Sequence, residues 1–315
     1  MEIREGKATD ILEIIKVLKA SLGEKDLPIS EQIWNFKHVD NPFGKSIVLL
    51  ALQNDEIVGV RAFMRWKWSA GNKNYSCFRA VDTATHPNHQ GKGIFKKLTL
   101  KAVEIAKKDG DDFIFNTPND KSRPGYLKMG WETAGKLEIG IRPAFSSFWK
   151  ILKQQPNYQR TIKASAKEIE SLCATWNADL EKKNAFFTRK SAEYLAWRFE
   201  NNPLQEYEVY ATPDFYLAAC TKSRGKITEL RVVECIYSNP VHFNEIKKII
   251  KYWSKKFGAQ AISFSPKVNK MPFPVYKGDL GPILTVKDLN LTEELKSSLL
   301  QIPNWNYSLG DMELF

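Results

Sequence analysis

The sequence lacks any long hydrophobic run and contains few cysteines. Its longest uninterrupted apolar run covers residues 47–52, far short of the roughly 20 residues that a membrane-spanning helix needs. The first residues show no apolar segment of a signal peptide, so we expect a cytoplasmic protein that does not bind a membrane. The four cysteines, Cys77, Cys173, Cys220 and Cys235, form no C-x-x-C pair. We therefore expect buried thiols and no metal site.

The charge of the chain is strongly positive but evenly spread. The chain has 47 Lys and Arg against 36 Asp and Glu, a net charge of +11 to which both halves contribute. A nucleic-acid-binding protein usually concentrates its basic residues in a patch or a tail, so we do not expect nucleic acid as a partner. Attraction to a polyanion such as a phosphorylated cofactor is favoured.

The first half of the chain alternates strands and helices. Apolar residues recur at helical spacing or fall in short β-type runs, bounded by capping residues, prolines and turns. The pattern predicts helices at 10–22, 30–41, 93–108 and 122–129, and strands at 46–52, 57–65, 77–85, 113–116 and 137–141.

The second half repeats features of the first, and 315 residues fit two domains. Residues 36–42 (FKHVDNP) resemble residues 197–203 (WRFENNP), and a glycine and a similar strand follow a later amphipathic helix in each half. We predict an α/β protein with two domains of one fold, each a mixed, mostly antiparallel central sheet flanked by helices. The expected domains are residues 1–145 and 161–315, joined by a linker at 146–160.

The most informative segment covers residues 80–95, AVDTATHPNHQGKGIF. A predicted strand enters a turn with Gly91 and Gly93, and the turn opens a helix. Such a turn directs several backbone N–H groups and a helix N-terminus at one anion, and glycine lets the backbone approach closely. Lys92 and Lys96 add positive charge, so the segment predicts a diphosphate site. The sequence has no P-loop, because Val39 stands where that motif needs a glycine before Gly44-Lys45-Ser46. The segment also lacks a dinucleotide-binding G-x-G-x-x-G motif, because Lys96 stands where the third glycine belongs.

The turn resembles motif A of the GCN5-related N-acetyltransferases, the GNAT family. That motif reads Q/R-x-x-G-x-G/A, and this chain has Gln90 and Gly93 in place, with Phe95 at the last position. A second motif of the family, N-x-x-A/S-x-x-x-Y-x-x-x-G-F/W, is matched by residues 119–131, NDKSRPGYLKMGW. Both motifs occur in the family's order, and the resemblance covers residues 1–142.

The resemblance implies that acetyl-CoA binds in a V-shaped opening between the strands at 80–85 and 113–116. Backbone groups of one strand would pair with the pantetheine arm, the turn's amides would hold the pyrophosphate, and the second motif would contact the cofactor. These cofactor-binding residues are Thr83, Ala84, Thr85, Gln90, Gly91, Lys92, Gly93, Ile94, Phe95, Asn119, Ser122 and Tyr126.

Acetyl transfer to an amine needs a base for the ammonium and an acid for the departing thiolate. Tyr126, placed near the sulfur by the motif, is the predicted acid; the alternative is a tyrosine that only packs. Asp82 is the predicted base; the alternative is a carboxylate satisfied by nearby amides or by Arg79. His38 and His86 are weaker candidates, Glu31 is expected on a solvated helix face, and a water chain is a further alternative to a side-chain base.

The second half lacks the anion-binding turn, because residues 235–245 contain no glycine. We therefore expect a degenerate GNAT-like domain that binds no cofactor and shapes the acceptor pocket. The predicted function is acetyl transfer from acetyl-CoA to a primary amine of a small molecule. The alternatives are a Fem-like aminoacyl transferase that uses charged tRNA and a non-catalytic acyl-CoA sensor. The identity of the amine and the assembly of identical chains stay open.

Overall fold

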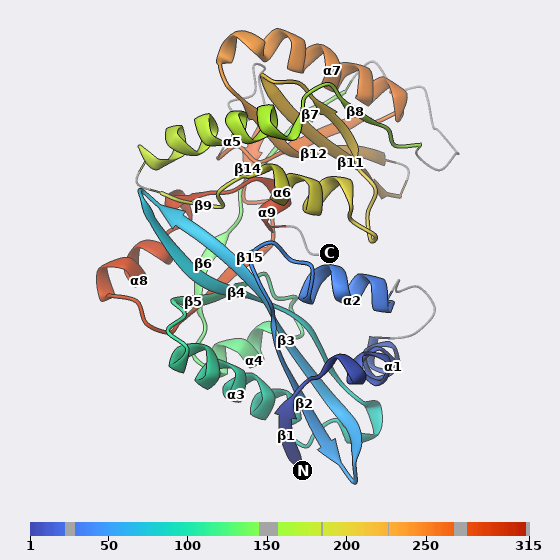
Figure 1. Cartoon of the computed structure of the whole chain (residues 1–315), viewed down its shortest axis with the longest axis vertical. Coiled ribbons are helices and arrows are strands. Elements are labelled where there is room, and N and C mark those ends of the chain that lie inside the picture. The colour runs from blue at the N-terminus through green and yellow to red at the C-terminus, as the bar shows by residue number, and fades with distance from the viewer. Residues whose placement is uncertain (23–28, 145–156, 184, 226, 268–275, 313–315) are drawn as a thin grey trace. The chain divides into compact units, whose positions relative to one another are not determined.

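The structure is a computed structural model that describes residues 1–22, 29–144, 157–183, 185–225, 227–267 and 276–312. The chain forms two compact units, drawn in Figure 1. Unit 1 comprises Met1–Trp68, Asn74–Gly135 and Pro282–Ile302, and unit 2 comprises Ser69–Lys73, Lys136–Gly281 and Pro303–Phe315.

Unit 1 is built on a mixed sheet. In sheet order its strands are β1 (Glu2–Glu5), β2 (Ile47–Gln53), β3 (Glu56–Ala70), β4 (Lys73–Thr85), β5 (Phe113–Asn116), β15 (Ile283–Asp288) and β6 (Glu132–Lys136). Strands β1, β2 and β3 pair antiparallel, β4 and β5 pair parallel, and β15 runs antiparallel to β5. The parallel pair is the one point where a helical crossover is needed, and α3 (Ile94–Lys108) supplies it.

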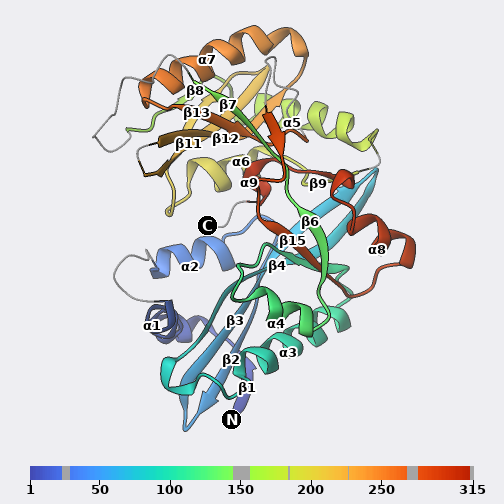
Figure 2. The same ribbon diagram turned by 180° about the vertical axis from the view of Figure 1, so that it is seen from behind.

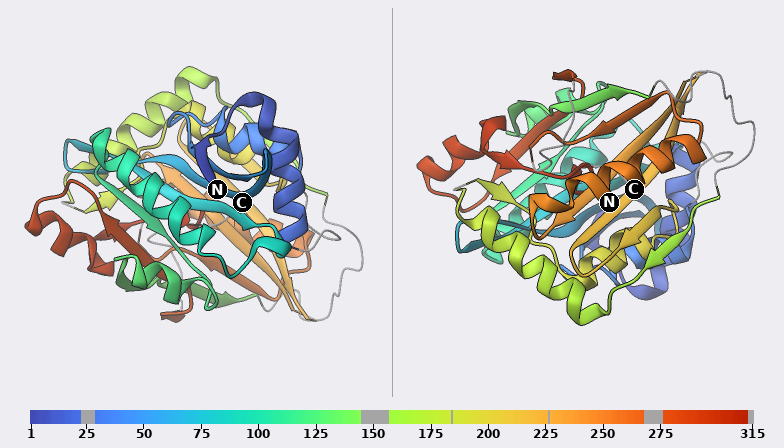
Figure 3. Two further views of the ribbon diagram at one scale, coloured as in Figure 1. Left: turned by 90° about the horizontal axis from the view of Figure 1, so that it is seen from below. Right: turned by 90° about the horizontal axis from the view of Figure 1, so that it is seen from above.

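Helices cover both faces of this sheet. On one face α1 (Ile11–Leu22) and α2 (Glu31–His38) bury an apolar stripe against β2 and β3. On the other face α3 packs Ile94, Leu98 and Ala102 against the same strands, and α4 (Arg123–Lys128) lies beside it. Figure 2 shows α3 and α4 in front of the sheet, and the left view of Figure 3 shows α1 and α3 on its opposite sides. Helix α8 (Glu293–Leu299) follows β15.

Unit 2 has its own mixed sheet. Its strands in order are β14 (Tyr276–Gly278), β7 (Ile139–Pro143), β13 (Ala261–Phe264), β12 (Ile227–Tyr237), β11 (Phe215–Arg224), β10 (Glu208–Ala211) and β8 (Arg160–Ile162). Its other elements are α5 (Ala166–Glu181), β9 (Phe186–Phe187), α6 (Ala192–Leu195), α7 (Phe243–Lys256), β16 (Trp305–Asn306) and α9 (Leu309–Met312). Helix α7 buries Ile246, Ile250 and Trp253 against β11 and β12.

Both units follow the same order from hairpin to crossover. In each, a long strand (β4 or β12) leads through a short 3₁₀ turn (Pro87–His89 or Pro240–His242) into a helix and then a parallel strand. The predicted α/β class, with two mixed sheets flanked by helices, is confirmed.

Each sheet contains one strand from the opposite half of the chain: β7 belongs to the sheet of unit 2, and β15 belongs to the sheet of unit 1. The strand predicted at 137–141 is present as β7, but it pairs with β13 and β14 of unit 2. The strand that pairs with β5 on its other side is β15, from the C-terminal part of the chain. The units therefore group residues differently from the predicted domains 1–145 and 161–315, which stay a prediction. Most of the linker expected at 146–160 lies outside the described residues, and Arg160 already belongs to β8.

The cysteine prediction is confirmed, because Cys77, Cys173, Cys220 and Cys235 are buried free thiols. None of the helices described is both long enough and apolar enough to cross a membrane. Among the described residues, no group of three or more His, Cys, Asp or Glu side chains could hold a metal ion.

Candidate functional site

The turn between β4 and α3 has the geometry of an anion site. Gly91 and Gly93 have φ values of +77° and +73°, in the left-handed region that favours glycine. Gly93 precedes Ile94, the first residue of α3, and the first turn of this helix contains no acidic residue. In the described part of the chain, the amides of residues 91–96 donate to no backbone carbonyl. An exposed set of N–H donors at a helix N-terminus favours a negatively charged ligand.

A cavity of about 420 Å³ opens beside this turn. It is lined by the end of β4, the turn and the start of α3, together with Ser21 and His89. Eight of the twelve predicted cofactor-binding residues line it: Thr83, Ala84, Thr85, Gln90, Gly91, Gly93, Ile94 and Phe95. The structure therefore brings together the strand end and the glycine turn that the sequence singled out.

Strands β4 and β5 separate next to this cavity. In the parallel pairing of β4 with β5, Cys77 lies opposite Phe113 and Arg79 lies opposite Phe115. Residues 80–85 of β4 have no recorded partner in β5. The hydrogen-bonding edge of β4 beyond Arg79 is therefore available to an extended ligand, in the manner of an added strand.

The remaining predicted cofactor residues lie elsewhere. Lys92 is exposed and is not among the residues described as lining the cavity. The Asn119 side chain accepts hydrogen bonds from the backbone N–H of Lys121 and of Ser122, and from the Ser122 hydroxyl at 3.0 Å. In this structure the two residues thus stabilise the turn before α4.

Tyr126 is almost fully buried, and its phenol oxygen has one recorded partner. The guanidinium of Arg61 on β3 donates from Nη1 to the Tyr126 hydroxyl oxygen at 2.8 Å. Phe95 packs its ring edge-on against Tyr126, with 5.6 Å between ring centroids. The side chain at the position where motif A usually has a small residue therefore points into the core, and the Phe95 backbone stays at the helix N-terminus.

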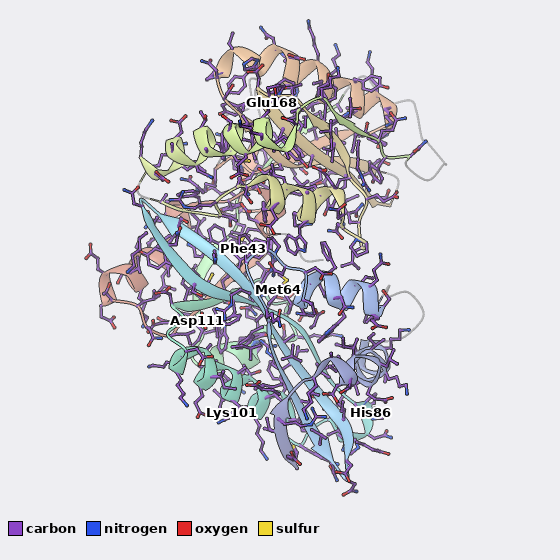
Figure 4. The ribbon with its side chains drawn as sticks, in the orientation of Figure 1. Phe43, Met64, His86, Lys101, Asp111 and Glu168 are labelled. Carbon is purple, nitrogen blue, oxygen red and sulfur yellow. The ribbon has the colours of Figure 1, made fainter. Side chains whose placement is uncertain are left out.

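Arg61 is a residue that the sequence analysis missed. Its side chain is completely buried among Phe63, Phe95 and Tyr126, and its Nε and Nη2 have no hydrogen-bond partner among the described residues. An arginine in the middle of an apolar strand (Val58 to Met64) was the available signal, since a buried cation needs a reason. Figure 4 labels Met64 on β3, near the centre of unit 1.

Asp82, the predicted base, lies in a cluster of charged and polar side chains. Its carboxylate is ion-paired with Lys37 and hydrogen-bonded at 2.8 Å to Nε2 of His38. His38 in turn shares a 2.8 Å hydrogen bond between Nδ1 and the Ser46 hydroxyl, and its ring lies on Trp34. The partners of Asp82 thus come from α2, on the opposite face of the sheet from α3.

The electrostatics of this cluster set the charges of Asp82 and His38. Burial alone would raise the pKa of Asp82, but the charge of Lys37 and the hydrogen bond from His38 outweigh it and hold that pKa well below its usual range. Burial lowers the pKa of His38, and the Asp82 carboxylate offsets this only in part. At neutral pH the pair is therefore an ionised carboxylate and a neutral imidazole.

The other base candidates are placed differently. His86 follows β4, where its Nδ1 accepts from the Asn88 amide at 3.3 Å, and Figure 4 labels it at that end of the strand. Glu31 is exposed at the start of α2. Lys37 and Ser46 were not singled out from the sequence, because a lysine on a helix and a serine before a strand give no local signal.

Comparisons with known proteins give a family match and structural likenesses. Residues 2–134 match the family model described as an acetyltransferase (GNAT) domain. Curated protein sequences give no significant match.

Solved structures resemble the chain over both units. One is a conserved protein from Enterococcus faecalis V583, a probable N-acyltransferase, with 12% identity and a TM-score of 0.66; the match covers 91% of this chain and 72% of that one. Another is a GCN5-related N-acetyltransferase from Anabaena variabilis, with 11% identity, a TM-score of 0.65 and coverage of 92% and 73%. A third is Eis1 from Mycobacterium abscessus, with 12% identity, a TM-score of 0.59 and coverage of 96% and 76%. At these identities the likeness shows the fold.

Proposed function

We propose, from the match of residues 2–134 to the GNAT acetyltransferase family model, that the chain transfers an acetyl group from acetyl-CoA to a primary amine of a small molecule. The family's chemistry is acyl transfer, and the choice of acetyl donor and amine acceptor is our proposal. The reaction is a direct attack of the neutral amine on the thioester carbonyl.

One observation carries the proposal: the cavity at the β4–α3 turn gathers eight residues of the predicted acetyl-CoA site. The left-handed glycines and the acid-free first turn of α3 support pyrophosphate binding there. The edge of β4 at Thr83–Thr85, which has no recorded partner in β5, supports the pantetheine arm, whose amides could pair with an extended strand.

Tyr126 is the proposed acid for the departing thiolate. Because Arg61 donates to the phenol oxygen, the hydroxyl proton of Tyr126 is directed away from that bond and can be given to another acceptor. Tyr126 is not among the described residues that line the cavity, but Phe95 lines it and packs on Tyr126. The side chain therefore lies directly behind the cavity wall.

The proposal is tested first by isothermal titration of the full chain with acetyl-CoA. We expect saturable binding, with weaker binding of S-acetylpantetheine, which lacks the 3′-phosphate and the pyrophosphate. No binding at millimolar acetyl-CoA would exclude the proposal. Release of free thiol from acetyl-CoA on addition of amines then distinguishes an enzyme from an acyl-CoA sensor, which binds without turnover. A tRNA mobility shift without acetyl-CoA binding would favour the aminoacyl transferase instead.

A further inference from the structure

A second cavity in unit 1 is lined by residues of α1 and α2, the end of β1 and the C-terminal end of α3. Its volume is about 730 Å³, within the usual range for small-molecule sites. Trp34 and His38 of α2 line it, together with Ser46, which directly precedes β2. None of its described lining residues lines the cavity at the β4–α3 turn, and the proposed function assigns it no role.

A hydrogen bond from β4 links the end of this strand to the wall of the second cavity. Thr83 lines the first cavity, and the preceding residue, Asp82, binds His38 at the wall of the second. Asp82 has φ of +39°, the left-handed region that is costly for a residue with a side chain. This local conformation interrupts the regular extended backbone of β4 directly before Thr83, which lines the first cavity.

The hydrogen bonds define which nitrogen of His38 can accept a proton. The Asp82 carboxylate is ionised and can only accept, so Nε2 of the neutral imidazole carries the hydrogen of the 2.8 Å bond. Nδ1 is then unprotonated and accepts from the Ser46 hydroxyl, also at 2.8 Å. Lys37 completes the chain by pairing with Asp82. A proton from a ligand in the cavity can therefore pass through the Ser46 hydroxyl to Nδ1 of His38.

We infer that the second cavity binds the acceptor amine and that Ser46 and His38 remove its proton. This inference rests on the proposed acetyl transfer. The ammonium group donates a proton to Oγ of Ser46 while the Ser46 hydroxyl proton moves to Nδ1 of His38. The products of this step are a neutral amine, an unchanged serine and an imidazolium that faces Asp82. Ser46 touches the substrate, whereas His38 acts through it and Asp82 holds the imidazole in place.

The lining of the cavity indicates the class of amine. Four carboxylate residues contribute to it: Glu5, Glu31, Asp40 and Asp109. Of the basic residues, Arg65 is ion-paired with Asp111, which leaves Lys7 and Lys45 on the lining. The carboxylates and the Trp34 wall suit a small organic cation, so the acceptor is a compact primary ammonium compound.

The test uses the full chain, acetyl-CoA and thiol release with glucosamine, glycinamide and spermidine as acceptors. We compare Ser46→Ala and His38→Gln with His242→Gln, in unit 2, as the matched histidine control. General acid–base groups contribute about 10²- to 10⁴-fold, so we expect Ser46→Ala and His38→Gln to lose at least about 10²-fold in kcat/KM. The Kd for acetyl-CoA should stay unchanged in both, and His242→Gln should resemble the wild type.

A pH profile separates proton transfer from simple positioning. The groups that face His38 are Asp82 on β4, Lys37 on α2 and the Ser46 hydroxyl. The rate should fall on the acid side as His38 becomes protonated, at the same pH for two amines of different pKa, and this limb should vanish in His38→Gln. Ser46→Ala removes only one oxygen atom, so this variant still tests the proton transfer even if His38→Gln fails to fold.

The outcomes distinguish this inference from the proposed function. Turnover by Ser46→Ala and His38→Gln equal to that of the wild type would overturn the inference and leave acetyl transfer intact. Acetyl-CoA binding without acetylation of any of the three amines would overturn the acceptor class. Absence of acetyl-CoA binding by the wild type would remove the proposed function and the inference together.

Discussion

At the scale of single residues, the neighbours of Asp82 and Tyr126 decide what each can do. The sequence identified both residues through their places in motifs, but not the Lys37 and His38 contacts of Asp82 or the Arg61 contact of Tyr126. A carboxylate whose pKa is held well below its usual range is a weak proton acceptor. The structure therefore favours Asp82 as the group that orients His38 over Asp82 as the base itself.

The role of Tyr126 gives the first prediction. Replacing Tyr126 with Phe removes the proposed acid, so kcat should fall by about 10²-fold or more while the Kd for acetyl-CoA changes little. The Arg61 guanidinium also loses its recorded hydrogen-bond partner, which should lower the free energy of unfolding by about 1–3 kcal/mol. Steady-state kinetics, titration and denaturant unfolding measure the three effects. Tyr252→Phe, at an exposed position on α7, is the control, and an unchanged kcat in Tyr126→Phe would contradict the acid role.

The buried His38 gives a prediction about pH and stability. Its pKa in the folded protein is lower than the usual 6.5, so below pH 6.5 the unfolded chain binds a proton that the folded chain resists. The stability contributed by neutral His38 is therefore complete above pH 6.5 and is lost as pH falls toward the lowered pKa, by at most about 1.4 kcal/mol per pH unit. Urea unfolding of wild type and His38→Gln between pH 7.5 and 5 measures the difference. Parallel curves for the two proteins would show that His38 does not titrate this way.

At the scale of elements, local signals were sufficient for the parts of the site that lie close together in sequence. Strand β5 is found at the predicted residues, and α3 begins directly after the glycine turn, because caps, glycines and apolar spacing fix such boundaries locally. Pairing across long separations has no such signal. Nothing near residue 61 or 46 indicates its partner, and β15 lies 167 or more residues beyond β5 in the chain. The grouping of the end of β4 with the glycine turn at one cavity was thus predictable, whereas the α2 cluster was not.

The turn between β4 and α3 gives a prediction with a control on the same helix. Gly93 precedes α3 with φ of +73°, and Gly110 follows it with φ of +84°, each with open space where a Cβ would stand. Changing either to Ala should destabilise the fold by a similar amount, roughly 1–2 kcal/mol. Only Gly93→Ala should weaken acetyl-CoA binding, because only that end of the helix offers its N–H groups to the ligand. Equal losses of affinity in Gly93→Ala and Gly110→Ala would contradict the assignment of the anion site.

At the scale of the whole molecule, the exchange of β7 and β15 makes each unit depend on both halves of the chain. Strand β15 pairs with β5 along residues 113–116 and buries Leu284 and Val286, and the Thr285 hydroxyl donates to Asn116. A fragment that ends near residue 145 contains the whole family match but lacks this strand. Its sheet would then expose an unpaired edge at β5, which favours aggregation.

This dependence predicts the behaviour of two fragments. Residues 1–144 alone should unfold without cooperativity or aggregate. Residues 1–137 joined by a short glycine–serine linker to residues 281–302 should unfold cooperatively and bind acetyl-CoA. The junction is short because the Gly281 amide donates to the Leu137 carbonyl at 2.9 Å. Thermal unfolding followed by circular dichroism, with acetyl-CoA titration of each fragment, measures the difference. If residues 1–144 matched the joined fragment in both measurements, β15 would be dispensable, and the first half of the chain would fold and bind its cofactor on its own.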